Sequence, residues 1–141
     1  MSLAYNKFNT FVADIDNKVH NLSSDQLKVA LSNSAPVATN TVLANITEIS
    51  YANISSRNIT TTSSTQSSGT YKLILVNLTL TASGAVGPFR YVVVYNSTAA
   101  GGPLIAWVDL GASWGPASNT MQNGDTLTIQ FDQTNGFFNL T

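Results

Sequence analysis

The stretch from Thr70 to Ala82, TYKLILVNLTLTA, decides the fold class of this chain. Its apolar side chains recur at alternate positions, which is the period of a β-strand and not that of a helix. One face is apolar from Ile74 to Leu80, whereas the other becomes polar at Asn77. We expect one continuous strand with one face on the core and a partly covered outer face.

Six further segments carry a strand signature and are separated by turn residues. They are 27–31, 57–64, 89–95, 104–110, a strand that starts at 123–125, and a last strand through Phe138 and Leu140. No helices alternate with them, which argues against a parallel βαβ sheet. The pattern predicts a mainly β chain built as an antiparallel β-sandwich, with jelly-roll-like and immunoglobulin-like topologies both open.

The remaining segments are predicted as one helix and three connections. Residues 7–21 should form an amphipathic helix packed on or beside the sandwich, because apolar side chains recur there at steps of three and four. The apolar stripe is Phe8, Phe11, Val12, Ile15, Val19 and Leu22. We expect a helical turn or irregular loop at 41–49, a loop or hairpin end at 63–69, and a loop without a helix at 111–119. The whole chain, 1–141, is predicted as a single domain.

Charged side chains are scarce. Asp, Glu, Lys and Arg make up 9% of the residues, against about 25% in an ordinary soluble domain. Yet 43% of the residues are hydrophobic, as in a chain that buries a core. A folded protein with so neutral a surface lacks the repulsion that keeps monomers apart. We therefore expect it to pack against copies of itself or another neutral surface.

The composition also excludes several kinds of site. The chain has no cysteine, and therefore no disulfide, thiolate metal site or cysteine nucleophile. Its six cationic residues are scattered, which leaves no basic footprint for nucleic acid. The sequence shows neither an apolar stretch of bilayer length nor the pattern of a signal peptide. We expect no nucleic-acid or membrane partner and synthesis in a cytoplasm.

One catalytic motif matches by letter. Residues 111–115, GASWG, fit the G-x-S-x-G elbow that exposes a serine nucleophile. Pro116 and Asn119 stand where the helix after the elbow should run. The only histidine, His20, precedes Ser113 in the chain, which is the wrong order for that fold. A plain Gly/Ser loop explains the motif better, and we predict no catalytic residue.

Two polar clusters have the ligand types of a metal site. His20 lies four residues after Asp16, so both can share a helix face, but two residues without other ligands do not make a metal site. Residues 123–125 and 132–135 could bring oxygens together for Ca²⁺, although Asx turns explain them as well. We predict no metal site and no cofactor.

Aromatic and proline side chains supply the candidates for an interface. These candidates are Trp114, Trp107, Tyr51, Pro103 and Pro116. The ring of Trp114, in a loop of small residues, fits a hydrophobic contact with a neighbouring subunit or stacking on a sugar. Trp107 lies in a predicted strand, in the core or an interface, and Tyr51 is a further candidate for sugar stacking. We expect the contacts to involve the loops 96–103 and 111–119 and the N-terminal segment.

Several stretches resemble small structural proteins of tailed bacteriophages and prophages. They are KFN at 7–9 with FV at 11–12 and Asp14, KVHNL at 18–22, LKVAL at 27–31, NSAP at 33–36, TNTVLA at 39–44, ITEI at 46–49 and FRYV at 89–92. The similarity spans most of the chain but consists of packing residues, with no catalytic signature. The resemblance implies a virion component, such as a capsid decoration (cement) protein or another head- or tail-associated part. Such decoration proteins are commonly β-rich and often trimeric.

The function expected from these features is structural. We expect a virion protein, made in the bacterial host's cytoplasm, that decorates the capsid through protein–protein contacts and is not an enzyme. Its expected partners are copies of itself, as a homotrimer, and the major capsid protein or another virion protein. A receptor- or carbohydrate-binding module of a phage tail or fibre is the alternative.

Overall fold

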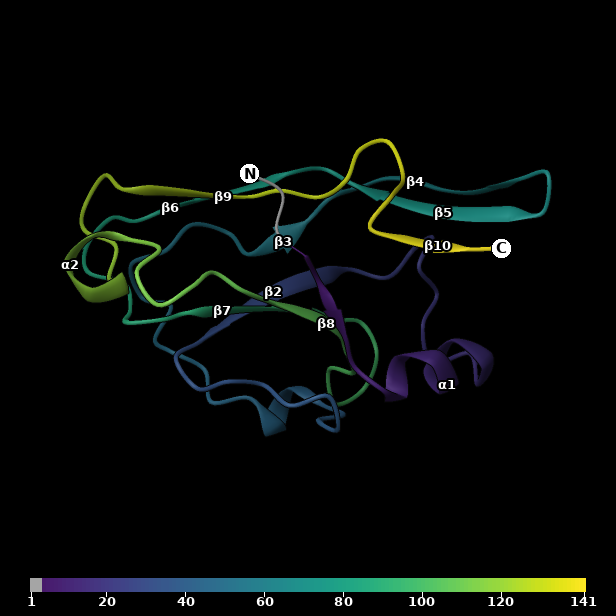
Figure 1. Cartoon of the computed structure of the whole chain (residues 1–141), viewed down its shortest axis with the longest axis horizontal. Coiled ribbons are helices and arrows are strands. Elements are labelled where there is room, and N and C mark those ends of the chain that lie inside the picture. Colours follow the sequence, from purple (N-terminus) through teal and green to yellow (C-terminus); the bar gives the residue numbers. More distant parts are fainter. Residues whose placement is uncertain (1–3) are drawn as a thin grey trace.

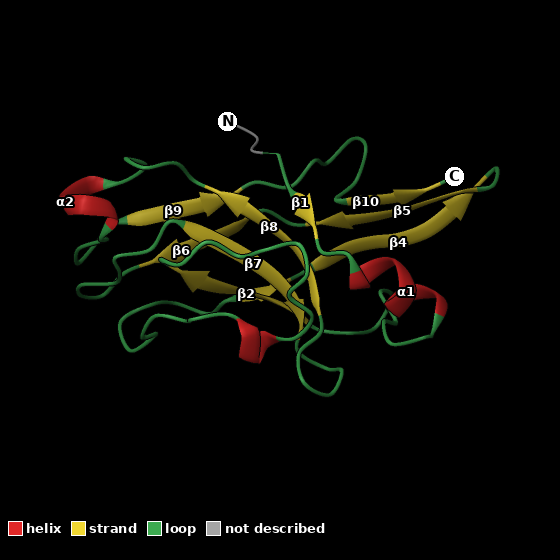
Figure 2. Ribbon diagram, turned by 60° about the horizontal axis from the view of Figure 1, so that its bottom comes forward, coloured by secondary structure: helices red, strands yellow, loops and turns green. Residues whose placement is uncertain are grey.

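The structure, a computed structural model, describes residues 4–141, apart from the side chains of 116 and 117. The chain is mainly β, with antiparallel sheets and a helix near its N-terminus, as predicted (Figures 1 and 2). The strands are β1 (Asn6–Lys7), β2 (Leu27–Ser32), β3 (Asn58–Ile59), β4 (Thr61–Ser67), β5 (Thr70–Leu75), β6 (Leu78–Thr81), β7 (Tyr91–Asn96), β8 (Leu104–Asp109), β9 (Thr126–Ile129) and β10 (Phe138–Leu140). The helical segments are α1 (Thr10–Asp16), the 3₁₀ turn η1 (Leu43–Asn45) and α2 (Pro116–Asn119).

The strands form three antiparallel sheets. Their orders are β1-β8-β7-β2-β3, β10-β5-β4 and β6-β9. Figure 1 shows β2, β7 and β8 in one layer, with β4, β5, β6, β9 and β10 in a second layer above it. The main hydrophobic core contains buried side chains from both layers, among them Val29, Leu75, Leu80 and Val94.

The central strands of the five-stranded sheet, β2, β7 and β8, are largely buried on both faces. In β7, Val92 and Val94 join the main core, whereas Val93 and Tyr95 join a second cluster on the opposite face. This double burial explains why β7 is a continuous apolar run, since neither face meets water. The second cluster also contains Ile46, beside η1, so the segment predicted as a helical turn or loop covers the outer face of the sheet.

The stretch 70–82 is not one strand, and the prediction is wrong on this point. It forms β5 and β6, which separate at residues 76–77 and pair with different strands. The interruption also changes which alternate positions face the core. Leu73 and Leu75 are buried in β5, whereas Leu80 is buried in β6. Strand side chains have a period of two, so a shift of one residue exchanges the two faces.

The N-terminal helix is shorter than the predicted 7–21. α1 ends at Asp16 because the backbone leaves the helical region shortly afterwards, at Lys18, whose φ is 61°. Val12, on the predicted apolar stripe, is 56% exposed, and Phe8 is buried from a position before the helix. The predicted apolar stripe therefore included side chains from three different elements: the end of a strand, a helix and a loop. Within residues 4–141, none of the helices has both the length and the apolar character that spanning a membrane requires.

Two predicted loops contain regular structure. β4 continues to Ser67, so the loop predicted at 63–69 is reduced to a turn at Ser68 and Gly69, with φ of 52° and 79°. Two-residue hairpin turns require such positive φ values, and the prediction underestimated how far the Thr- and Ser-rich strand extends. The loop predicted at 111–119 ends in the four-residue turn α2, where no helix was expected.

Candidate functional site

The two candidate hydrolase residues lie at opposite ends of β7. His20 contacts Asn96, the last residue of that strand. Ser113 lies at the other end. The residue after it, Trp114, donates a hydrogen bond to the backbone oxygen of Phe89, which precedes β7. The six residues of β7 span about 17 Å at about 3.3 Å per residue. The fold therefore does not bring this serine and this histidine together as a nucleophile and base.

His20 instead belongs to a buried polar network. Its side chain is fully buried, and the Asn96 side chain is its hydrogen-bond partner, with 3.1 Å between Asn96 Nδ2 and His20 Nδ1. Asn96 Nδ2 also donates to Asp25 Oδ2 (2.6 Å). Asn96 Oδ1 accepts the backbone N–H groups of Thr98 and Ala99 (2.9 and 3.1 Å). Asn96 thus ties the end of β7 to two loops.

These contacts fix the protonation of His20. Since Asn96 Oδ1 already accepts two N–H groups, its Nδ2 faces the ring and can only donate, so His20 Nδ1 accepts and the ring proton lies on Nε2. His20 Nε2 has no hydrogen-bond partner among the described residues and lies 3.9 Å from Asp14 Oδ2. Burial lowers the pKa of His20, an effect that the charges of Asp14 and Asp25 partly offset.

The stability of the fold should decrease as the solution becomes acidic. His20 has a lower pKa in the folded chain, so below about pH 6.5 the unfolded chain binds a proton that the folded chain does not. This contribution to stability is complete above the unfolded pKa and is lost as the pH falls toward the folded pKa. Thermal melting from about pH 8 to about pH 5 should show the decline. His20→Gln, which removes the only imidazole, should flatten it; an unchanged decline in that variant would contradict the assignment.

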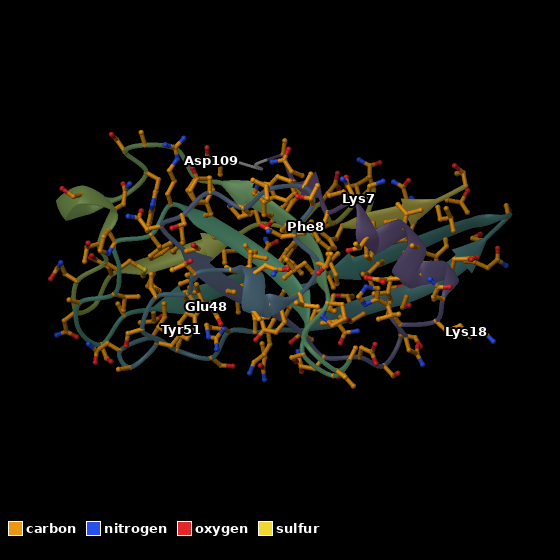
Figure 3. All side chains as sticks on the ribbon, turned by 90° about the horizontal axis from the view of Figure 1, so that it is seen from below. Lys7, Phe8, Lys18, Glu48, Tyr51 and Asp109 are labelled. Carbon is orange, nitrogen blue, oxygen red and sulfur yellow. The ribbon has the colours of Figure 1, made fainter. Side chains whose placement is uncertain are left out.

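Tyr51 closes an open edge of β2. β3 pairs only with the first two residues of β2, Leu27 and Lys28. The rest of that edge of β2 has no partner in β3. There the Tyr51 hydroxyl accepts the backbone N–H of Leu31 (3.0 Å) and donates to Glu48 Oε1 (2.6 Å), and Figure 3 shows these two side chains together. Burial and the hydrogen bond to Glu48 raise the pKa of Tyr51, so the phenol stays protonated.

Arg57 completes this edge. Its Nη1 donates to the backbone oxygen of Val29 (2.6 Å), and its own backbone oxygen accepts the Val29 N–H (3.1 Å). The guanidinium carbon lies 3.6 Å from the centre of the Tyr51 ring, and Nη1 lies 4.0 Å from Glu48 Oε1. This cation–π contact covers one face of the Tyr51 ring, and that face is not available to stack on a sugar.

Tyr51→Phe should lower the free energy of unfolding by about 1–3 kcal/mol, because the N–H of the buried Leu31 loses its acceptor. Urea denaturation measures the change. Tyr91→Phe is the matched control, since the Tyr91 hydroxyl makes no hydrogen bond within residues 4–141. The control should change stability by no more than about 0.5 kcal/mol. Equal losses in the two variants would show that Tyr51 does not act through its hydroxyl.

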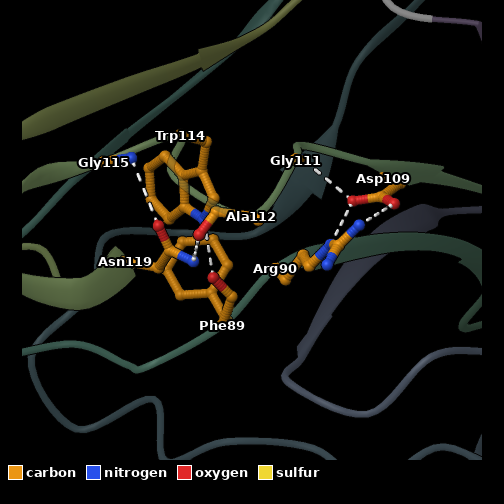
Figure 4. A network of polar contacts seen from close by, with 8 residues as sticks. All are labelled: Phe89, Arg90, Asp109, Gly111, Ala112, Trp114, Gly115 and Asn119. Atoms are coloured by element: carbon orange, nitrogen blue, oxygen red, sulfur yellow. Dashed lines mark hydrogen bonds and ion pairs between the residues drawn. The ribbon is translucent and has the colours of Figure 1, made fainter.

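Trp114 is anchored within the chain. Its indole N–H donates to the backbone oxygen of Phe89 (2.6 Å), and the two rings lie 4.6 Å apart (Figure 4). Asn119 Nδ2 donates to the backbone oxygen of Ala112 (3.0 Å), which closes the loop around the indole. Trp114 remains half-buried and, with Leu127, lines a groove of about 240 Å³. It can therefore contribute to a contact only from a fixed position.

The other interface candidates differ in exposure. Trp107 is half-buried, and its ring packs 4.5 Å from that of Phe8 on the second cluster. Pro103 is buried and bridges to Val42, so it presents little surface. The side chain of Pro116 lies outside the described residues.

Of the residues considered as calcium ligands, Asp132 forms an Asx turn, and Asp125 accepts a backbone N–H group from the turn that precedes it. Asp132 Oδ1 accepts the backbone N–H groups of Thr134 and Asn135, both at 2.8 Å, and these contacts lower the pKa of Asp132. Asp125 Oδ2 likewise accepts the Gln122 N–H (2.7 Å). Each carboxylate is used locally, as the turn interpretation predicts. Among the described residues, no group of three His, Asp or Glu side chains is placed to hold a metal ion.

An apolar groove of about 610 Å³ lies between the loop after α1 and the β10-β5-β4 sheet. Its apolar lining includes Ile15, Leu22, Phe138 and Leu140. Leu140 is 55% exposed and extends the apolar surface of this groove. Further large apolar side chains that remain exposed are Val12, Val37 and Val76.

The sequence did not single out Asn96, Arg57 or Phe89, which hold these sites together. In the sequence, Asn96 has the features of a turn residue at the end of a strand, and Arg57 has those of an ordinary exposed cation. Their roles depend on burial and on partners distant in sequence, for which no local spacing provides a signal.

Comparison of the chain with known protein families, curated proteins and solved structures finds no match. The function therefore has to be inferred from the geometry and surface chemistry described above.

Proposed function

We propose that this chain is a structural protein of a phage virion that decorates the capsid as a homo-oligomer, through protein–protein contacts. The main support is the surface, which combines very few charges with exposed apolar side chains such as Leu140 and Val12. Burying such a surface desolvates few charges, and the contact depends little on salt. The resemblance to small phage structural proteins points the same way.

The architecture inferred for this module is an antiparallel β-sandwich. Its support is the pair of strand layers in Figure 1 and the core side chains that both layers contribute. A rigid framework of this kind suits a protein that must hold its contact surfaces in fixed positions. The polar edge closure at β2 by Tyr51 and Arg57 also prevents uncontrolled strand addition there.

The groove beside Leu140 is the surface on which the proposal can be tested. A neighbouring subunit that covered it would bury Leu140 and the Phe138 ring, both of which line it. Burying a leucine side chain contributes about 1.5–3 kcal/mol to an association. Contacts of this size, repeated around a symmetry axis, stabilise a small oligomer.

The mass of the purified protein and its binding to expanded capsids test the proposal. We expect a trimer that binds, with little change in affinity between low and high salt. Leu140→Asp should weaken both properties, whereas Asn139→Asp adds the same charge at an exposed neighbouring position and should leave them unchanged. A strict monomer that ignores capsids would overturn the proposal.

The carbohydrate-binding alternative has weaker support. Arg57 covers one face of Tyr51, and Phe89 packs against Trp114, so neither ring is a free platform. Glycan-array binding that is lost in Trp114→Ala would favour this alternative over the structural role.

A further inference from the structure

A polar pocket of about 310 Å³ lies at the edge of β2 and β3. Its lining residues are Lys28, Tyr51, Ile54, Ser55, Ser56, Arg57 and Asn58. Two of the chain's six cationic side chains thus line one pocket, although the cations are scattered along the sequence. The nearby acidic group is Glu48, which already accepts the Tyr51 O–H and lies 4.0 Å from Arg57 Nη1.

The pocket is rich in hydrogen-bond donors. Of the Arg57 nitrogens, only Nη1 donates a hydrogen bond within residues 4–141, which leaves Nε and Nη2 available. Ser55 Oγ accepts the Thr81 N–H (2.9 Å), and Ser56 Oγ accepts the Asn58 N–H (3.3 Å). Both hydroxyls can therefore direct their protons elsewhere. The ammonium of Lys28 can only donate.

Arg57 is also held in place before any ligand arrives. The Val29 carbonyl fixes Nη1 at 2.6 Å, and the Tyr51 ring supports the guanidinium plane at 3.6 Å. A side chain ordered in this way loses little conformational entropy when it binds a ligand.

Another arginine of this chain, Arg90, shows which group the Nε/Nη2 edge of a guanidinium can bind. Arg90 Nε and Nη2 donate to the two oxygens of Asp109 at 2.6 and 2.7 Å (Figure 4). This paired contact holds the pKa of Asp109 below its usual value. Within residues 4–141, no acid makes such a paired contact with the equivalent edge of Arg57. The planar fork of arginine matches a carboxylate.

We propose that this pocket is a carboxylate-binding site. The Nε/Nη2 edge of Arg57 takes both oxygens of the carboxylate, Lys28 adds a second positive charge, and the hydroxyls of Ser55 and Ser56 donate to the remaining lone pairs. The carboxylate comes either from a small organic acid or from an Asp or Glu side chain of another protein. The site goes beyond the proposed function, and it would bind whether or not the chain belongs to a virion.

Titration with sodium acetate, followed by NMR of the Arg57 Nε–H and Lys28 signals at constant ionic strength, tests this proposal. We expect saturable shifts at these two residues, and none when acetamide, the uncharged analogue, replaces acetate. A short peptide with one Asp and blocked ends separates the two sources. Tighter binding than acetate indicates a protein side chain, and equal or weaker binding indicates a small acid. No saturable shift with either probe would overturn the proposal.

Three variants make the test specific. Lys28→Met should weaken acetate binding about fivefold, whereas Lys7→Met, on β1 at the opposite edge of the sheet, should not change it. Glu48→Gln should strengthen binding about threefold, because it removes a competing negative charge and keeps an acceptor for Tyr51. Arg57→Lys should weaken binding by about tenfold or more, since the fork is lost while the charge stays.

The variants must be compared in the folded state. The Lys28 ammonium makes no hydrogen bond among the described residues, and its backbone pairing in β2 does not depend on the side chain. Lys28→Met should therefore fold even if the Arg57 variant does not. Equal effects of Lys28→Met and Lys7→Met would mean a general charge effect and would overturn the site. The mass and capsid-binding measurements would be unaffected by that result, so the two proposals can fail separately.

Discussion

Asn96→Ala should lower the free energy of unfolding by about 3–5 kcal/mol, a large part of the stability of a typical domain. Asn96 is fully buried, and its side chain makes four hydrogen bonds at 2.6–3.1 Å. Truncation leaves His20 Nδ1 and the N–H groups of Thr98 and Ala99 without partners inside the protein, and each such group is costly to bury. Urea denaturation measures the change.

The control for this prediction is Asn139→Ala. Asn139 is exposed on β10, so its loss should change stability by no more than about 0.5 kcal/mol. Asn96→Asp sharpens the test, because it preserves the shape but places a second oxygen against Asp25 Oδ2, where the amide nitrogen stood at 2.6 Å. It should destabilise the fold most at neutral pH, where both carboxylates are charged. If Asn96→Ala lowered the free energy of unfolding by less than about 1 kcal/mol, the hydrogen bonds of Asn96 would not act together to stabilise the fold.

Phe89→Ala should destabilise the fold by about 3–5 kcal/mol, because it removes a fully buried ring from the core and leaves a cavity. The effect should also reach the loop 111–119, since the Trp114 indole packs on that ring at 4.6 Å. We therefore expect the tryptophan fluorescence of the folded variant to shift to the red as Trp114 gains contact with water.

Val12→Ala serves as the control for the core truncation. Val12 is 56% exposed, so its truncation should cost no more than about 0.5 kcal/mol and leave the fluorescence unchanged. Phe89→Leu separates volume from aromatic contact: it should recover part of the stability and little of the ring packing. A stable Phe89→Ala variant with unchanged fluorescence would show that the loop is held by the Trp114 hydrogen bond alone.

Most strands could be predicted because their signal is local. The alternation in 27–31 and the apolar runs in β7 and β8 depend on each residue's own side chain and its immediate neighbours. The helix was overestimated because Phe8 is buried from a strand end, although its spacing to Phe11 fits a helix. The spacing of apolar residues alone does not distinguish a side chain buried at a strand end from one buried on a helix.

The residues that organise the polar sites were harder to identify from the sequence, for a related reason. The Asx turn at Asp132 could be predicted because it is made within four residues, and the contact of Asp125 with Gln122 is equally local. The pocket at Arg57 and the network at Asn96 unite segments that are far apart in sequence; Asp25 and Asn96, for example, are 71 positions apart. The chain order and the residues after Ser113 already argued against a serine–histidine pair. The structure adds that Ser113 and His20 lie at opposite ends of β7.

By itself, the sequence determined that this chain is mainly β, nearly uncharged and able to bury a core, because residue type and alternation are local properties. Only the tertiary structure decided where the strand signal at 70–82 is interrupted. There the Asn77 side chain accepts the backbone N–H of Phe131 (2.9 Å), so a contact across 54 residues separates β5 from β6. It also decided which polar groups are buried, because the cost of burying one depends on partners that only the folded chain supplies.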